Sequence, residues 1–320
     1  MNQTIKQPVI IALLIFALLL PTVAGAVNFK RLIVFGASLS DPGNAYALSG
    51  EAISAPYSEV DDLYVPPAPY KKGGNHFSNG ATWIEQLAKQ LRLGQSAEAA
   101  FGDSTDNATN YAVGGARARE DGINLSAQVA TFLNDVSNTA PADALYVLDM
   151  GANDVRDALA AKASQMSGIF SDALTAIGTH LGQLYFAGAR KFLVLNVPDL
   201  GALPSTRILN YVYPGIVYFA GQLTTAFNNS LDGVTAGISA LPGVEMVRFD
   251  VYGKVNQVMA TPSAFSLTDV ASPCITPEIP PYSCKKPDSY LFGAAFTPRR
   301  PDIGFLPAKP HGSSRNSQIP

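Results

Sequence analysis

The chain has 320 residues, of which 47% are hydrophobic and 15% are charged, and its formal net charge is −3. This apolar content is ample for a folded core and excludes wholesale disorder. A mildly acidic chain without basic runs is not typical of a nucleic-acid-binding protein. Two cysteines exclude both a disulfide-rich scaffold and a four-cysteine zinc site. Any histidine-based catalysis must use His76, His180 or His311.

The N-terminus has the pattern of a secretory signal peptide. Lys6 precedes an unbroken apolar run from Val9 to Leu20, and Ala24-Gly25-Ala26 fits the small-residue cleavage rule. The alternative is a transmembrane anchor, but the run is well short of the roughly 20 residues that span a bilayer. We therefore expect residues 1–26 to be removed and the protein to be secreted or periplasmic, with association to the outer membrane as a further option.

Cys274 and Cys284 flank a short proline-rich loop. Export would place both residues in an oxidising compartment, where thiols pair. A disulfide between Cys274 and Cys284 is therefore expected, and two free buried thiols are the alternative.

Five short apolar runs alternate with amphipathic stretches, which predicts buried parallel strands joined by helices. The runs are Arg31–Phe35, Thr109–Val113, Ala144–Met150, Lys191–Val197 and Val244–Phe249. The helical stretches are Ala81–Leu91, Val155 to about Ala187, and Ile216–Leu241. This alternation favours an α/β fold with an open parallel sheet covered on both faces, in a domain spanning residues 27–292.

Small and polar residues follow the predicted strands. Ser38 follows the first strand, Gly114 and Gly115 the second, and Asn153 the third. Ligands of open parallel sheets bind beyond the carboxyl ends of the strands. Singly, Ser38 and Asn153 could cap helices and the two glycines could form a tight turn. Together they supply a hydroxyl, backbone donors and an amide, which suits attack on a carbonyl with an oxyanion hole.

Six segments occur in a recognisable order. They are FGASLSDPGNA, HFSNGATWIEQLA, NYAVGGA, GAND, NVPDLGALP and CKKPDSYLF, between Leu32 and Phe292. In this order they resemble the blocks of the GDSL, or SGNH, family of secreted bacterial esterases and lipases. The resemblance implies a three-layer α/β/α sandwich of flavodoxin-like type with a five-stranded parallel sheet. It also implies an acylhydrolase that needs no metal or organic cofactor.

The resemblance assigns a role to each matching residue. Ser38 matches the nucleophile, and its backbone N–H is expected in the oxyanion hole. Gly115, or less favourably Gly114, matches the second donor, and the Asn153 side-chain amide the third. Ala37 stands where the family has aspartate, which puts the local turn geometry in question but not the class of chemistry.

The general-base histidine of the family has no match. Family members carry D-x-x-H-P shortly after a YLF-like run, whereas here YLF is followed by GAAFTPRRP. His76 lies in a segment that forms the rim of the site in the family. His180 lies within a predicted helix, and His311 has no aspartate three residues before it. We expect none of the three to act as the base.

We interpret the tail from residue 293 to 320 as the product of a frameshift, which would be either a sequencing error or a true mutation; an ordinary disordered basic tail is the alternative. With codons chosen within the degeneracy of the code, one added nucleotide after the Phe292 codon makes the tail read FWGGIHPATAGHR. This resembles the family's FWDGIHPTxAGHR, with glycine in place of the orienting aspartate. Residues 293–320 are therefore expected to be aberrant and disordered. The chain should be weakly active or inactive, with one sheet face partly uncovered.

Other functions remain open at this point. One is a phospholipase or lipid acyltransferase of the same fold, for which Tyr57, Tyr64, Tyr70 and Phe77 would supply an apolar rim. Others are a deacetylase of acetylated sugars and a non-catalytic binding remnant. The expected partner is a small-molecule or lipid ester, with contact to a membrane surface in the lipid case.

Overall fold

The computed structural model describes residues 29–49, 77, 81–102, 107–119, 124–274 and 284–293. The predicted signal peptide, His76, His311, the rim tyrosines and the tail beyond residue 293 lie outside these ranges. Within the described chain, the main sheet has four parallel strands in the order β1-β2-β3-β4. They are β1 (Leu32–Gly36), β2 (Leu145–Asp149), β3 (Lys191–Leu195) and β4 (Glu245–Phe249).

Helices follow most strands along the chain. They are α2 (Asn44–Ser49), α3 (Trp83–Leu91), α4 (Leu125–Asp135), α5 (Ala152–Ala160), α6 (Ala163–Ala187), α7 (Pro204–Leu209), α8 (Ile216–Ser239) and α9 (Val251–Ala260). The stretch predicted as one helix from Val155 to about Ala187 is two helices. The break arises because Ala161 and Lys162 both adopt extended backbone angles, which lets α6 fold back against α5.

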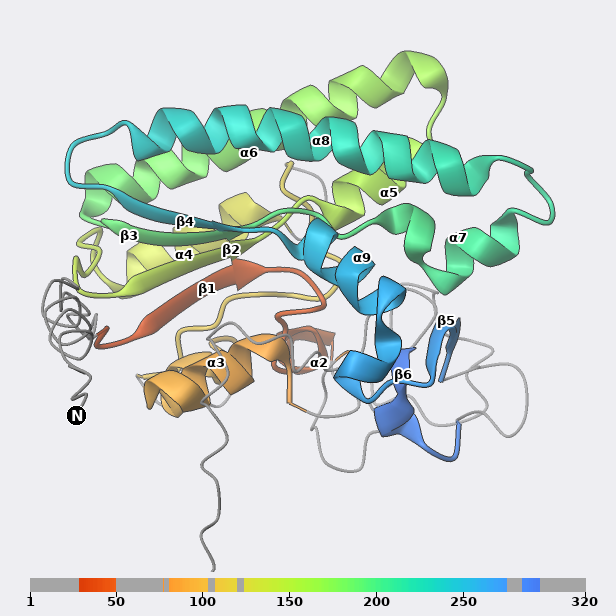
Figure 1. Ribbon diagram of the computed structural model, residues 1–320. Coiled ribbons are helices and arrows are strands. Elements are labelled where there is room, and N and C mark those ends of the chain that lie inside the picture. Colours follow the sequence, from red (N-terminus) through yellow and green to blue (C-terminus); the bar gives the residue numbers. More distant parts are fainter. Residues whose placement is uncertain are drawn as a thin grey trace, which may run out of the picture.

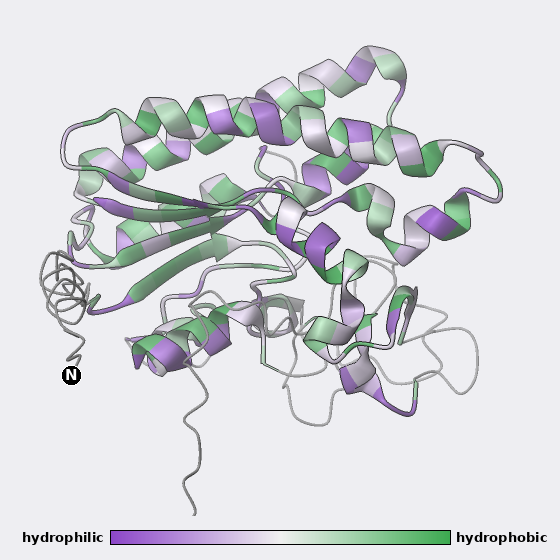
Figure 2. Ribbon diagram, viewed as in Figure 1, coloured by the Kyte–Doolittle hydropathy of each residue, from purple (hydrophilic) through white to green (hydrophobic). Residues whose placement is uncertain are grey.

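The sheet is the middle of three layers (Figure 1). Alternate residues of the strands point to opposite faces, because successive side chains of a strand do so. One face packs on α3 through Trp83, Ile84 and Leu87. The other face packs on α4, α6 and α8, including Phe132 and Phe227. The predicted α/β/α sandwich is thus confirmed, and Figure 2 shows the hydrophobic strands enclosed between these helices.

The expected fifth strand, Thr109–Val113, is not formed as a strand. This segment runs beside β1 and makes isolated parallel bridges from Asn110 to Val34 and to Ala99. Further along, the Val113 N–H donates to the Gly36 carbonyl at 3.1 Å. The Gly36 N–H, however, donates to the side-chain oxygen of Gln128 at 2.9 Å instead of to the segment, and the Gln128 side chain donates back to the Gly36 carbonyl at 2.9 Å. A side chain on α4 therefore replaces one of the backbone hydrogen bonds that would extend the ladder.

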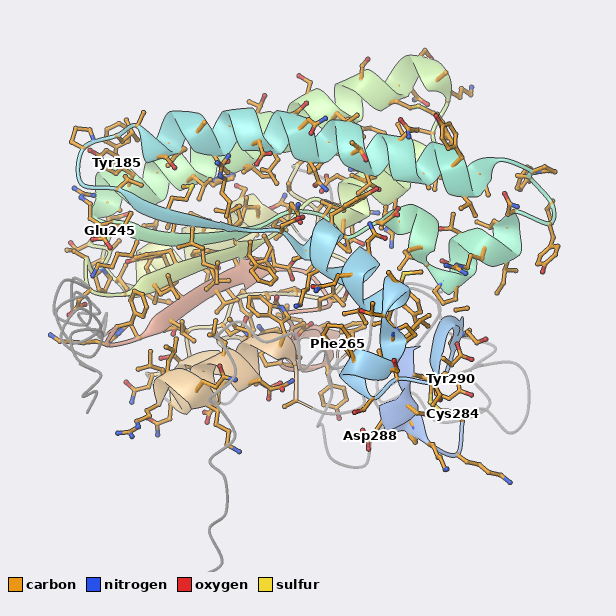
Figure 3. The ribbon with its side chains drawn as sticks, in the orientation of Figure 1. Tyr185, Glu245, Phe265, Cys284, Asp288 and Tyr290 are labelled. Carbon is orange, nitrogen blue, oxygen red and sulfur yellow. A yellow bond between two sulfur atoms is a disulfide. The ribbon has the colours of Figure 1, made fainter. Side chains whose placement is uncertain are left out.

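Beyond β4, α9 leads to a small second sheet. It pairs β5 (Asp269–Pro273) with β6 (Tyr290–Phe292). The disulfide between Cys274 and Cys284 is present, as expected from the sequence. Figure 3 labels Tyr290 in β6 and shows Cys284 and Asp288 beside this small sheet. The Cys274 N–H donates to the Phe292 carbonyl at 2.9 Å, which ties the two strands together.

None of the helices within the described ranges is both long enough and apolar enough to cross a membrane.

Candidate active site

Ser38 lies in the tight turn that follows β1. The Ser40 N–H donates to the Ala37 carbonyl at 3.0 Å, which closes the turn around Ser38. Alanine at position 37 therefore supports a regular turn. Ser38 is partly exposed. Within the described chain, neither its N–H nor its hydroxyl makes a hydrogen bond, so both remain available to a substrate.

Asp41 fixes the end of this turn. Its side chain is fully buried and accepts hydrogen bonds from four backbone N–H groups. The donors are Gly43 at 2.7 Å, Asn44 at 2.6 Å, Ala45 at 3.1 Å and Gly114 at 2.7 Å. Burial raises the pKa of this carboxyl to about 6, against the opposing effect of the four donors.

Gly114 and Gly115 form the middle of the turn from Val113 to Ala116, which closes with a backbone hydrogen bond of 3.1 Å. A Cβ on Gly114 would lie 2.2 Å from the Phe77 ring, whereas one on Gly115 would meet no atom within 4 Å. Gly115 has a φ of +79°, as the third residue of a type II turn requires. Gly114 already donates its N–H to Asp41. In the described chain the Gly115 N–H has no acceptor, so it suits the role of an oxyanion donor better than Gly114.

Asn153 lies in the first turn of α5, directly beyond β2. One hydrogen of its side-chain amide is donated to the Ala116 carbonyl at 2.7 Å. An amide nitrogen carries two donors, so one remains for a ligand. The positive end of the helix dipole at this N-terminus also favours a developing negative charge. The hydrogen bond links Asn153 to the same turn that carries Gly115.

Asp154, the next residue, anchors α5 to the segment after that turn. Its carboxylate is fully buried and accepts from the Ala118 N–H at 2.9 Å and from the Arg119 guanidinium at 3.2 Å. Burial raises its pKa, and these donors oppose the rise. Asp157 lies nearby and pairs with Arg117 and Arg119. With Arg156, which also pairs with Asp157 at 3.2 Å, the cluster has two aspartates and three arginines and fixes the helix that carries Asn153.

A second polar network lies behind the nucleophile turn, and sequence reasoning missed it. The Ser40 hydroxyl donates to the Asp149 carboxylate at 2.6 Å and accepts from the Trp83 ring N–H at 2.9 Å. Burial raises the pKa of Asp149, and the hydrogen bonds to Ser40 and Trp83 oppose the rise. The network joins β1, β2 and α3 beneath Ser38. The sequence signal that could have revealed this network is Asp149, a polar residue at the end of an apolar strand.

No general base stands beside Ser38 within the described chain. Of the three histidines only His180 is described; it is buried in α6, and its Nδ1 lies 2.8 Å from the Gln183 side-chain oxygen. No hydrogen bond joins His180 to Ser38. The described residues also contain no group of three or more histidine, cysteine, aspartate or glutamate side chains that could hold a metal ion.

Comparison with known proteins agrees with this geometry. Residues 32–270 match the family model described as GDSL-like Lipase/Acylhydrolase. The chain is 29% identical over 247 residues to a phosphatidylcholine-sterol acyltransferase of Aeromonas hydrophila, covering 77% of this chain and 65% of that protein. It is 27% identical to the GDSL esterase/lipase At1g23500 of Arabidopsis thaliana, covering 84% of each chain. It is 30% identical to Lipase 1 of Photorhabdus luminescens, covering 65% of this chain and 28% of that lipase.

Proposed function

Because the chain belongs to the GDSL-like lipase/acylhydrolase family, we propose that it derives from a serine hydrolase of carboxylic esters with Ser38 as its nucleophile. The observation that carries this proposal is the set of donors at the carboxyl ends of the strands. The N–H groups of Ser38 and Gly115 lack acceptors within the described chain, and the Asn153 amide has a hydrogen to spare. Three unpaired donors beside a free hydroxyl suit an oxyanion hole.

The proposed chemistry has two steps. The Ser38 oxygen attacks the acyl carbon, and the three donors hold the oxyanion until the alcohol leaves with a proton. Water then attacks the acyl-enzyme, releases the acid and restores the Ser38 hydroxyl. Both steps need a base that takes a proton from the attacking oxygen, which is histidine in the usual serine hydrolases.

We propose that the base was lost by a frameshift after the Phe292 codon. Support comes from the sequence, in which the restored frame supplies an I-H-P segment shortly after YLF. The two residues that directly precede the proposed frameshift, Leu291 and Phe292, are buried in the core. Without its base a serine nucleophile loses several orders of magnitude in rate, and oxyanion binding leaves a residual activity.

Hydrolysis of p-nitrophenyl acetate and butyrate tests the proposal. Three proteins are compared: the chain from Val27 to Pro320, the same chain with the restored tail, and the restored chain carrying Ser38→Ala. We expect low turnover by the first and Ser38-dependent turnover by the second. Large Ser38-dependent turnover by the unrestored chain would refute the loss of the base. Equal turnover by the restored chain and its Ser38→Ala variant would refute Ser38 as the nucleophile.

A lipid acyltransferase or phospholipase is the second candidate, favoured by the similarity to the phosphatidylcholine-sterol acyltransferase. In this reaction a sterol hydroxyl takes the place of water in the second step. Product analysis of the restored chain with phosphatidylcholine and sterol separates the two reactions, since a transferase yields a sterol ester and a hydrolase yields free fatty acid.

We further propose that the protein is exported, because the first 26 residues have the pattern of a cleaved signal peptide. The disulfide between Cys274 and Cys284 supports an oxidising compartment. The intact mass of the protein recovered from an exporting host shows whether cleavage follows Ala26.

A further inference from the structure

An exposed apolar surface lies on the connection between α7 and α8. We call it the aromatic patch. It consists of Ile208, Leu209, Tyr211, Val212, Tyr213, Tyr218 and Phe219. Tyr211 is 90% exposed, Val212 68%, Tyr213 62% and Tyr218 73%. Single exposed apolar residues are ordinary, but a contiguous group of this kind marks an interaction site.

The backbone of the aromatic patch is ordered by its own hydrogen bonds. The Tyr213 N–H donates to the Leu209 carbonyl at 2.8 Å, and the Ile216 N–H donates to the Tyr213 carbonyl at 3.1 Å. The Gly215 N–H donates to the Asn210 side chain at 2.9 Å. The exposed side chains are therefore presented on a preformed turn, and little backbone entropy is lost when they bind a partner.

The position of the patch relates it to the candidate active site. Helix α7 begins shortly after β3 ends, and α8 leads away from the turn. Figure 1 shows this turn projecting at the end of the molecule toward which the strands point. That is the end at which Ser38 follows β1 and Asn153 follows β2, and the Asn153 side chain is bonded there to the turn that carries Gly115. A surface bound there would lie at the same end of the sheet as Ser38.

The chemistry of the patch favours a phospholipid surface over a protein. Tyrosine rings combine an apolar body with a polar tip, which suits the boundary between acyl chains and headgroups. Between Leu200 and Leu231 the only charged residue is Arg207, whereas the whole chain has a net charge of −3. Arg207 is exposed beside the patch, and a guanidinium binds phosphate well. The patch thus offers one cation and no carboxylate to lipid phosphate.

We propose that the aromatic patch docks the protein onto a phospholipid surface, with its tyrosine and aliphatic side chains in the headgroup boundary. The use of this surface rests on the proposed ester-hydrolase function, since it would bring lipid esters to Ser38. The docking itself does not require turnover, so it can be measured with Ser38 removed.

Vesicle binding tests the proposal. The chain from Val27 to Pro320 carrying Ser38→Ala contains every described element and lacks the apolar run Val9–Leu20, which would itself bind lipid. Sedimentation with phosphatidylcholine vesicles gives its partition coefficient. These vesicles carry no net charge, so they do not attract the basic tail. We expect the added pair Tyr211→Ser and Val212→Ser to lower this coefficient by about tenfold or more.

Phe186→Ser is the matched control. Phe186 is 83% exposed, but it lies at the far end of α6, next to the labelled Tyr185 in Figure 3 and near the start of β3. Its replacement should leave vesicle binding unchanged. Equal losses in the patch variant and the control would show general stickiness and would overturn the proposal. Circular dichroism of each variant checks that the fold is retained.

Two further outcomes would contradict lipid docking. One is an absence of vesicle binding by the parent chain. The other is a dimer in light scattering that the patch variant converts to a monomer, which would assign the patch to a second copy. A failure of the ester-hydrolase proposal appears separately, as missing Ser38-dependent turnover of soluble ester by the restored chain, and does not alter the vesicle result.

Discussion

The carboxylate of Asp41 accepts the N–H of Gly114 at 2.7 Å, and this bond joins the nucleophile turn to the turn that carries Gly115. The two turns are 73 residues apart in sequence, so Asp41 sets their relative position. The carboxylate must be ionised to accept all four of its donors, yet burial raises its pKa to about 6. Protonation of Asp41 thus relieves the larger cost of burying its charge, although it weakens one of these hydrogen bonds.

The first prediction concerns stability against pH. The pKa of Asp41 is raised in the folded state, so the folded protein binds a proton more tightly than the unfolded chain does. The contribution of Asp41 is thus most favourable at acid pH and declines as pH rises through about 6. The free energy of unfolding in urea is measured for the parent chain and for Asp41→Asn. We expect the stability of the parent chain relative to this variant to fall by up to about 3 kcal/mol between pH 4 and pH 7.

The control for this comparison is Asp250→Asn, which removes an exposed helix-capping carboxylate. A decline that appears equally in both variants would come from the loss of a helix-capping carboxylate in general and not from the burial of Asp41. A flat profile for Asp41→Asn would contradict the raised pKa of Asp41.

The second prediction separates the two neighbouring glycines. Gly114→Ala places a Cβ 2.2 Å from the buried Phe77 ring, which must then move. Such overpacking costs about 1–3 kcal/mol. Gly115→Ala meets no atom within 4 Å and costs about 1 kcal/mol, because its φ of +79° is unfavourable for alanine. Urea denaturation should rank Gly114→Ala as the less stable variant, and the reverse order would refute this packing.

The candidate site residues could be predicted from local sequence, whereas the buried residues that hold them in position could not. Ser38 and Asn153 each follow a strand, and Gly115 follows the segment beside β1, and each of these three apolar runs is recognisable on its own. Asp149 also ends such a run, but its role depends on the pairing of Gly36 with Asp149 across β1 and β2. No local pattern reveals which buried residue will meet its carboxylate.

The error in strand number has a similar cause. Thr109–Val113 is apolar enough for a strand, and its backbone does bond to Val34. What interrupts the ladder is Gln128, a polar residue on the buried side of α4, which accepts the Gly36 N–H in place of the segment. The Gln128 side chain, which is distant in sequence, thus takes the Gly36 N–H from the backbone of the segment. The strand propensity of residues 109–113 cannot reveal this contact.

The third prediction concerns the ion pairs around Asn153. Asp154→Ala removes a fully buried carboxylate and leaves the Ala118 N–H and part of the Arg119 charge without an acceptor. We expect a loss of about 3 kcal/mol in the free energy of unfolding. Asp232→Ala is the matched control, because its partner Arg248 and Asp232 itself are more than half exposed. It should cost less than about 1 kcal/mol. Similar losses for both would show that the buried cluster adds nothing beyond a surface pair.

The last prediction concerns the sheet face that α3 covers. Val34, Val147, Leu193 and Val247 form one row across this face, and their exposed fractions are 0, 0, 7 and 60%. Cover of this face by the described residues therefore fades toward β4. Val147→Ala should cost about 2 kcal/mol, and Val247→Ala less than about 0.5 kcal/mol.

The same pair of variants also tests the frameshift independently of activity. If the restored tail packs over β4, Val247 becomes buried, and the cost of Val247→Ala should rise toward that of Val147→Ala in the restored chain. Val147→Ala should cost the same with either tail, because Val147 is already fully buried. An unchanged cost of Val247→Ala in the restored chain would show that the restored tail does not cover this face.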